Sequence, residues 1–262
     1  MNLKPFTILL TFICLCTTST SGVSAKGPDD QTVKWLSTQD AKAGVSAETI
    51  TIGTSVKGVP ITASRYGTKG GAVVLLVGQV HGSEKGSRKI LQGIADAMLL
   101  DAPTLDVWVI FVANPDGASS NERTNFNKVD LNRNFPTSDW KLSSRGRNYS
   151  GKYARSEPET KALVDFIQTR KPVLSVWYHQ VGPVVDPHPL GDMNIMREYA
   201  KTVKYPLSAA RCAGSCVGTA TTYHSENVKG STAFVVELPA KVTRAHIVRN
   251  VAAFMQILTI ID

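Results

Sequence analysis

The chain has 262 residues, of which 42% are hydrophobic and 19% are charged. This composition excludes a disordered, collagen-like or coiled-coil protein, and the length suits about one large domain. The formal charge of +8 admits anionic partners. We expect no nucleic-acid binding, because no Lys/Arg run with interleaved aromatic residues occurs in the sequence.

The first 25 residues have the pattern of a secretory signal peptide. Lys4 precedes a short apolar run at 6–16, and small residues stand at positions −3 and −1 of a cleavage site after Ala25. The run is shorter than the roughly 20 residues that a membrane-spanning helix needs. We therefore expect a secreted or periplasmic protein without a stable membrane anchor, with a poorly ordered lead-in at 26–45 before the folded domain.

The predicted signal peptide determines which cysteines remain in the mature protein. Cys14 and Cys16 lie inside the predicted signal peptide, which leaves Cys212 and Cys216. Their C-x3-C spacing could form half of a metal site, but no His or Cys stands at finger-like spacing from them. In an oxidising compartment a local disulfide between Cys212 and Cys216 is favoured, and we expect it to shape one loop.

Hydrophobic patterning predicts a sheet with buried central strands. An alternating pair of strands is expected at 49–65. Runs that are apolar at almost every position predict strands covered on both faces at 72–78, 106–113, 173–178 and 233–236.

Helices are expected between these strands. Apolar residues spaced three or four apart predict a helix at 86–100, and further helices are expected at 157–169 and 243–260. The stretch at 114–156 is long, polar and without periodicity, which is common for functional segments in compact domains. Strands that alternate with helices predict one α/β domain with a largely parallel sheet, and we expect a monomer.

Polar side chains stand at the carboxyl ends of the buried strands, where parallel sheets gather ligands. His81 and Glu84 follow the first such strand, His179 follows the third, and Glu237 ends the fourth. Two histidine nitrogens and a carboxylate with one open position form a catalytic zinc arrangement. Taken singly, His81 and Glu84 could be a surface pair and His179 a core histidine. Glu237 is harder to explain, because a charge at the end of a buried strand needs a partner or a role.

Motifs in the irregular stretch add a family resemblance. Residues 114–117 read NPDG and residues 130–136 read DLNRNFP. Together with HGSE at 81–84, SEPET at 156–160 and VELP at 236–239, these runs make the sequence similar to the zinc carboxypeptidase family, which includes carboxypeptidase A and bacterial murein peptide amidases. The resemblance covers about residues 49–239. It implies a catalytic domain at 46–262 with a doubly wound, mostly parallel mixed sheet and helices on both faces.

The resemblance also implies a role for each matched residue around the metal. His81, Glu84 and His179 correspond to the three ligands of one Zn²⁺, and Glu237 to the general base that takes a proton from the zinc-bound water. Arg123 corresponds to the cation that stabilises the oxyanion. The chemistry requires these roles, since zinc lowers the pKa of its water toward ~7 and a carboxylate must accept the proton.

The resemblance also implies roles for residues of the DLNRNFP run in binding the substrate and in orienting a metal ligand. Asn132 and Arg133 correspond to the pair that clamps the free carboxylate of the substrate, for which the planar fork of arginine is suited. Asp130 corresponds to the acid that orients His81. Some relatives use a catalytic tyrosine from a mobile loop, but neither Tyr205 nor Tyr223 stands at an equivalent position, so no catalytic tyrosine is assigned.

Three further polar residues stay open at this point. His188 and His224 are both candidates to contact substrate, and for His224 an ordinary loop position is favoured. Asn148 begins an N-x-S sequon, which matters only in a eukaryotic source.

These observations together predict a secreted zinc metallocarboxypeptidase whose partner is a peptide with a free carboxylate. Size and expected export favour the bacterial murein branch, in which the substrate is a peptidoglycan stem peptide cut at a γ-D-glutamyl–diaminopimelate bond. The first alternative is a general carboxypeptidase that acts on ordinary C-terminal residues. The second is a non-catalytic wall- or peptide-binding module on the same fold.

Overall fold

The computed structural model describes residues 48–209 and 216–261. The predicted signal peptide at 1–25, the lead-in at 26–45 and Cys212 lie outside the described residues. Within the described ranges, no helix combines the length and the apolar character needed to cross a membrane.

A mixed sheet forms the centre of the described chain, with seven strands in the order β1-β2-β4-β3-β5-β7-β6. The strands are β1 Glu48–Thr54, β2 Pro60–Gly67, β3 Val73–Val77, β4 Asp106–Ile110, β5 Leu174–Gln180, β6 Val184–Pro187 and β7 Thr232–Leu238. The four central strands β4, β3, β5 and β7 are parallel, and β1, β2 and β6 pair antiparallel to their neighbours at the edges. The predicted mixed, mostly parallel sheet is thereby confirmed.

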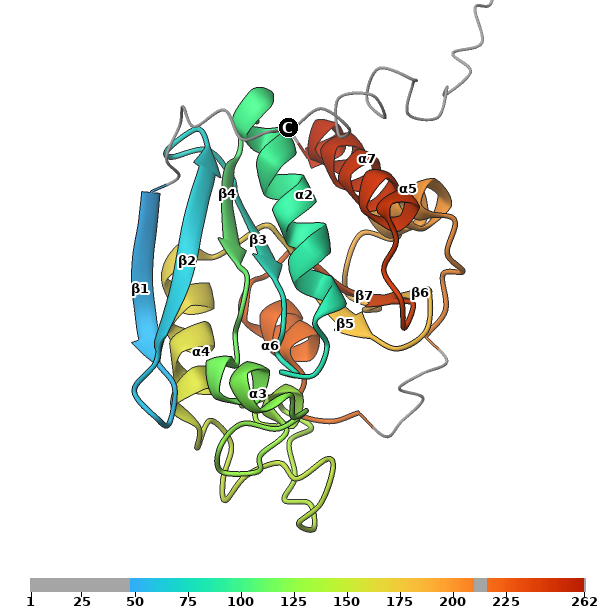
Figure 1. Cartoon of the computed structure of the whole chain (residues 1–262). Helices are drawn as coiled ribbons and strands as arrows, with labels where there is room; N and C mark the ends of the chain where they lie inside the picture. The colour runs from blue at the N-terminus through green and yellow to red at the C-terminus, as the bar shows by residue number, and fades with distance from the viewer. Residues whose placement is uncertain (1–47, 210–215, 262) are drawn as a thin grey trace, which may run out of the picture.

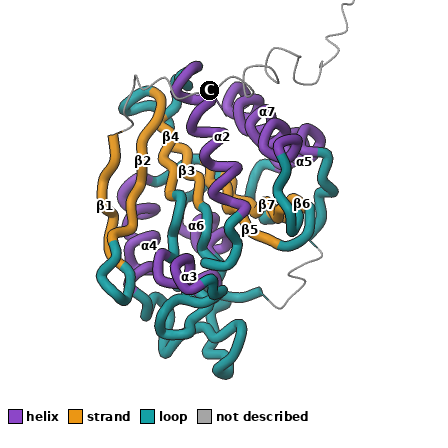
Figure 2. The backbone as a smooth tube through the Cα atoms, viewed as in Figure 1, coloured by secondary structure: helices purple, strands orange, loops and turns teal. Residues whose placement is uncertain are grey.

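Helices lie on both faces of this sheet (Figures 1 and 2). They are α2 Gly86–Leu100, α3 Pro115–Ser120, α4 Pro158–Arg170, α5 Met193–Val203, α6 Ala220–Asn227 and α7 Arg244–Ile261, with a 3₁₀ turn η1 at Leu131–Arg133. Helices α2, α5 and α7 cover one face, and α4 and α6 cover the other.

The two faces explain why the central strands are mostly apolar. Val74 and Leu76 of β3 pack into the core under α2, α5 and α7. Their neighbours Leu75 and Val77 point the other way and pack into the core shared with α4 and α6. A strand buried on both faces admits few polar side chains until it reaches the carboxyl edge of the sheet, and the candidate site lies at that edge.

The segment between β5 and β7 contains elements that the sequence analysis did not predict, namely β6, α5 and α6. Helix α5 had a readable signal, because its buried residues are spaced three or four apart and Asp192 caps its first turn. Its buried residues are Ile195, Met196, Tyr199, Ala200 and Val203. Helix α6 has mostly polar residues and no apolar stripe, so periodicity could not have found it.

Candidate active site

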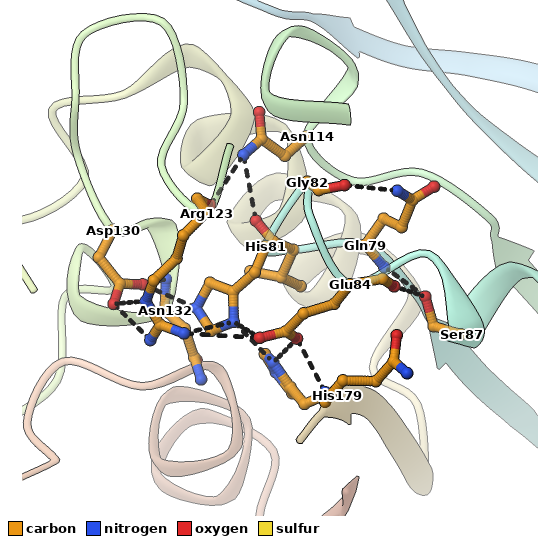
Figure 3. Close-up of polar contacts among 12 residues, drawn as sticks. Gln79, His81, Gly82, Glu84, Ser87, Asn114, Arg123, Asp130, Asn132 and His179 are labelled. Carbon is orange, nitrogen blue, oxygen red and sulfur yellow. Dashed lines mark hydrogen bonds and ion pairs between the residues drawn. The ribbon is translucent and has the colours of Figure 1, made fainter. Parts of the chain in front are cut away.

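Three predicted metal ligands come together at the carboxyl edge of the sheet (Figure 3). His81 and Glu84 lie in the loop between β3 and α2, and His179 lies near the end of β5. All three side chains are buried, and their ligand atoms lie within 4.8 Å of one another. Residues almost a hundred positions apart in the chain therefore form one cluster, which we call the rim cluster.

The atoms that face one another in the rim cluster are all suited to bind a cation. His81 Nδ1 lies 2.8 Å from Glu84 Oε1, His179 Nδ1 lies 2.9 Å from Glu84 Oε2, and the two Nδ1 atoms are 3.0 Å apart. A tetrahedral zinc with bonds of about 2.0–2.1 Å separates its ligand atoms by about 3.3 Å. The nitrogen and carboxylate donors and their spacing therefore fit Zn²⁺ bound by three protein ligands.

Asp130 supports the ring of His81 from the side opposite Glu84. It lies at the start of η1 with no solvent exposure, and its Oδ1 is 2.9 Å from His81 Nε2. Since a carboxylate only accepts, His81 Nε2 donates to Asp130, and Nδ1 is the ring nitrogen that faces the cluster. Burial opposes its ionisation, but His81 and Arg123 hold the pKa of Asp130 well below its usual range.

Arg123 joins this acid to the rim cluster. Its Nε and Nη2 donate to Asp130 Oδ2 at 3.1 and 2.7 Å, which fixes the guanidinium plane. Its Nη1 lies 3.1 Å from His81 Nδ1 and 3.5 Å from Glu84 Oε1. A fixed positive group therefore stands at the edge of the donor set, and its oxyanion role stays a prediction.

Glu84 is held as a carboxylate. Burial raises its pKa, but His179 and His81, through their charges and hydrogen bonds, hold the pKa of Glu84 well below its usual range. The backbone N–H of Gln180 also donates to Glu84 Oε2 at 3.1 Å.

The NPDG motif holds the loop that carries His81 and Glu84. Asn114 accepts from the N–H of Gly117 at 2.9 Å and donates to the carbonyl of Val80 at 3.2 Å. A Cβ added to Gly82 would lie 1.9 Å from the carbonyl carbon of Gly117. Only a glycine at position 82 allows the two loops to approach so closely, which gives the physical reason for the HG and DG pairs in the sequence.

Strand register brings Glu237 beside the rim cluster. His179 of β5 and Glu237 of β7 are direct partners in the parallel ladder. This pairing puts Glu237 next to a predicted metal ligand, and because Glu237 is only half-buried, it is also within reach of solvent.

Sequence reasoning missed Gln180, which ties three parts of the site together. Its Oε1 accepts from the N–H of Gly86 at 2.7 Å, and its Nε2 donates to the carbonyl of Pro239 at 2.8 Å. The side chain thus connects the start of α2 to the segment that follows Glu237. The only signal in the sequence was its position directly after His179.

Asn132 of the predicted carboxylate clamp lines a pocket of about 290 Å³ together with His188. Asn132 Oδ1 accepts from the N–H of Ala220 at 2.9 Å, so its amide NH₂ is the group left for a ligand. Arg133 is half-buried and donates to the carbonyl of Asn132 at 2.7 Å and to Cys216 Sγ at 3.0 Å. Burial lowers the pKa of the Arg133 guanidinium. The expected disulfide of Cys216 stays a prediction, because Cys212 lies outside the described residues.

Three other candidates lie away from the rim cluster. Tyr223 is buried against Phe135 in the core under α4 and α6, and Tyr205 is buried in the opposite core. His224 has no solvent exposure and belongs to α6. The prediction that His224 is a loop residue is therefore wrong, because this segment is a helix packed on the sheet.

The sequence of this chain is similar to those of known zinc carboxypeptidases and murein peptide amidases. The sequence profile of the family described as zinc carboxypeptidase matches residues 32–248. Murein peptide amidase A of Vibrio campbellii is 32% identical over 149 residues, which cover 51% of this chain and 58% of that protein. Its Escherichia coli K12 counterpart is 32% identical over 118 residues, covering 40% and 48%. Carboxypeptidase Z of Rattus norvegicus is 30% identical over 192 residues, covering 57% and 29%. The matched stretch thus spans about half the length of the amidases and less of carboxypeptidase Z.

Solved structures share the fold. The murein-tripeptide amidase of Escherichia coli O157 matches with a TM-score of 0.64 at 24% identity, covering 83% of this chain and 93% of that one. Bovine thrombin-activatable fibrinolysis inhibitor matches with a TM-score of 0.74 at 18% identity, covering 88% and 95%. Both comparisons confirm the α/β architecture.

Proposed function

Because this chain belongs to the zinc carboxypeptidase family, we propose that it is a secreted peptidase. We propose further that it hydrolyses the peptide bond next to a free carboxylate. We infer that its substrate is a peptidoglycan stem peptide, cut at the γ-D-glutamyl–diaminopimelate bond. One observation carries the catalytic part of the proposal: His81, Glu84 and His179 form a zinc-type donor set, and the strand register puts Glu237 beside it.

The residues of the chain divide the chemistry between them. His81, Glu84 and His179 would hold Zn²⁺, which when bound lowers the pKa of a water molecule toward ~7 and polarises a carbonyl. The carboxylate of Glu237 accepts the proton of the attacking water and returns it to the leaving amine. Arg123, fixed by Asp130, donates to the oxygen on which negative charge develops.

Asn132 and Arg133 supply the recognition of the terminal carboxylate. Asn132 lines a pocket together with His188 and Cys216, and the guanidinium of Arg133 contacts the carbonyl of Asn132 and the sulfur of Cys216 beside it. A free carboxylate between these donors places the last peptide bond of a substrate toward the rim cluster, which makes the enzyme an exopeptidase.

The choice of substrate rests on the relatives. Proteins named murein peptide amidase A share 32% identity with about half of the chain, and the formal charge of +8 suits acidic stem peptides. The similarity to carboxypeptidase Z supports the alternative, a carboxypeptidase for ordinary C-terminal residues. A non-catalytic binding module is not favoured, because a complete ligand set and Glu237 are present.

Product analysis by mass spectrometry separates these proposals. The zinc-loaded full chain is incubated with L-alanyl-γ-D-glutamyl-diaminopimelate and, separately, with a panel of ordinary peptides. We expect free diaminopimelate from the first substrate and slow or no release from the panel. Efficient release of ordinary C-terminal residues without cleavage of the wall peptide would contradict the murein substrate, and no cleavage of either would contradict the proposed activity.

A further inference from the structure

A second concave surface lies over the start of α2, on the face of the sheet that α2 shares with α7. It is a groove of about 910 Å³ lined by α2, the first turn of α7, and residues that follow β3 and β4. Helices α2 and α7 are in close contact beside it, because a Cβ added to Gly93 would lie 2.5 Å from Ile247 Cγ2. None of the ligands of the rim cluster lines this groove.

The groove is strongly basic. Lys85, Arg88, Lys89 and Arg244 line it, against one acid, Asp96. Lys85, Arg88 and Lys89 are exposed, and no ion pair joins them to a carboxylate in the part of the chain that the structure describes. Their positive charges are therefore left for a partner.

The position of these charges costs the fold stability. Arg88 and Lys89 lie in the first turn of α2, where the helix dipole disfavours cations by about 0.3–1 kcal/mol each. The first turns of α2 and α7 contain no acid, whereas α4 has Glu159 at that place. Cations in this position without a local partner are available to an anionic ligand.

The rest of the lining restricts what that anion is. Half-buried Phe111 and Ile247 provide apolar surface between the cations. Gln79, at 1% exposure, also lines the groove, and its Nε2 is used by the carbonyl of Gly82 while its Oε1 has no partner among the described residues. A ligand that satisfies this lining carries anionic groups, a hydroxyl that donates to an acceptor, and flat apolar faces.

We propose that this groove binds an acidic polysaccharide. Sugar rings bearing carboxylates have all three features: the carboxylates pair with Arg88 and Lys89, the ring faces pack on Phe111 and Ile247, and a hydroxyl donates to Gln79 Oε1. A lipid surface fits less well, because the groove offers two half-buried apolar side chains rather than a broad exposed apolar face. The proposal goes beyond the peptidase activity, since the groove would hold the enzyme on a polymer while the rim cluster cleaves peptides.

Binding is tested by calorimetry with a polygalacturonate oligosaccharide as the probe and a neutral galactose oligosaccharide of equal length as its control. We expect wild-type protein to bind the acidic oligosaccharide at least about tenfold more tightly than the neutral one. The double variant Arg88→Glu/Lys89→Glu should lose at least about tenfold in affinity for the acidic probe. The matched variant Lys161→Glu/Lys229→Glu, with the same change of net charge at other exposed lysines, should bind like wild type.

Three outcomes overturn the proposal: no binding of the acidic oligosaccharide, equal loss in both double variants, or equally tight binding of poly-L-glutamate or phosphatidylglycerol vesicles. Cleavage of a short peptide is measured in parallel, and both double variants should match wild type. If wild type cleaves no peptide, the proposed function fails while the binding result stands by itself.

Discussion

Two buried histidine clusters lie on the same face of β5, and only one of them has balanced hydrogen bonds. We call the first the closed cluster; it contains Ser175, Trp177 and His224. Trp177 Nε1 donates to Ser175 Oγ at 2.9 Å, Ser175 Oγ bonds His224 Nδ1, and His224 Nε2 donates to the carbonyl of Pro172 at 2.7 Å. Each hydrogen has one acceptor, and the neutral form of His224 fits without a ligand.

The rim cluster lies further along β5, two residues beyond Trp177 at His179, and its hydrogen bonds do not balance, because His179 Nε2 is buried without a partner among the described residues. Two Nδ1 atoms and a carboxylate face one another at 2.8–3.0 Å, and His81 Nε2–H is already used by Asp130. Two ring nitrogens and a carboxylate gathered around one point, with Arg123 at its edge, form the donor set that binds a cation such as Zn²⁺. Burial of a histidine is thus uninformative by itself, and the balance of donors and acceptors distinguishes a structural site from a metal site.

The largest effect should come from Glu237→Gln. The amide keeps the shape of the side chain but cannot accept a proton, so kcat should fall by about 10²–10⁴-fold. Zinc content, measured by mass spectrometry of the metal, should match wild type, because Glu237 is no ligand in the rim cluster. Turnover close to that of wild type would show that another group is the base.

A second large effect concerns the clamp. Amidation of the terminal carboxylate of a substrate with a single carboxylate should cost wild type roughly 2–5 kcal/mol in kcat/KM. Arg133→Ala should lose a similar amount with the free acid and then respond little to amidation. Both changes remove the same contact, so their effects should not add. Full additivity would leave Arg133 as a structural residue and contradict the exopeptidase assignment.

The closed cluster should affect stability and its pH dependence. Burial lowers the pKa of His224 to about 4, whereas an unfolded histidine titrates near 6.5. Between about pH 6.5 and 4 the unfolded chain takes up a proton that the folded chain refuses, so His224 should reduce the free energy of unfolding by about 3 kcal/mol as the pH falls through that window. Above that window its contribution should be flat.

The variant that tests this is His224→Gln. Its side-chain amide can hydrogen-bond near Ser175 and Pro172 as the imidazole does, but it does not titrate. Denaturant unfolding at several pH values should show a shallower acid dependence in this variant than in wild type, with zinc content unchanged. Identical pH dependence in the two proteins would contradict a neutral His224 in the folded state.

A smaller effect is expected at Gln180, which connects α2 to the segment after Glu237. Gln180→Ala should lower kcat by about 10–100-fold, as is common for residues that orient metal ligands. Gln180→Glu keeps the acceptor for the N–H of Gly86 and loses the donor to Pro239, so it should recover part of the loss. An unchanged kcat in Gln180→Ala, measured at saturating substrate, would contradict a positioning role.

The sequence predicted the parts of the site that end buried strands. His81, Glu84, His179 and Glu237 each follow an apolar run, and parallel strands deliver their carboxyl ends to one edge. Gln180 could not be found this way, because its contacts with Gly86 and Pro239 depend on the packing of three distant segments. The loop position expected for His224 was wrong for a related reason: α6 has no apolar stripe, and the burial of His224 follows from the place of α6 over the sheet rather than from local pattern.

Anomalous diffraction at the zinc absorption edge from crystals of the zinc-loaded protein tests the central claim most directly. The account predicts one strong peak at about 2.0–2.2 Å from His81 Nδ1, His179 Nδ1 and a Glu84 oxygen, with His81 Nε2 still bonded to Asp130. In crystals of the His81→Ala variant prepared in the same way, this peak should be absent. No peak at the rim cluster in wild type, or a peak at other residues that persists in His81→Ala, would contradict the assignment of this cluster as the zinc site.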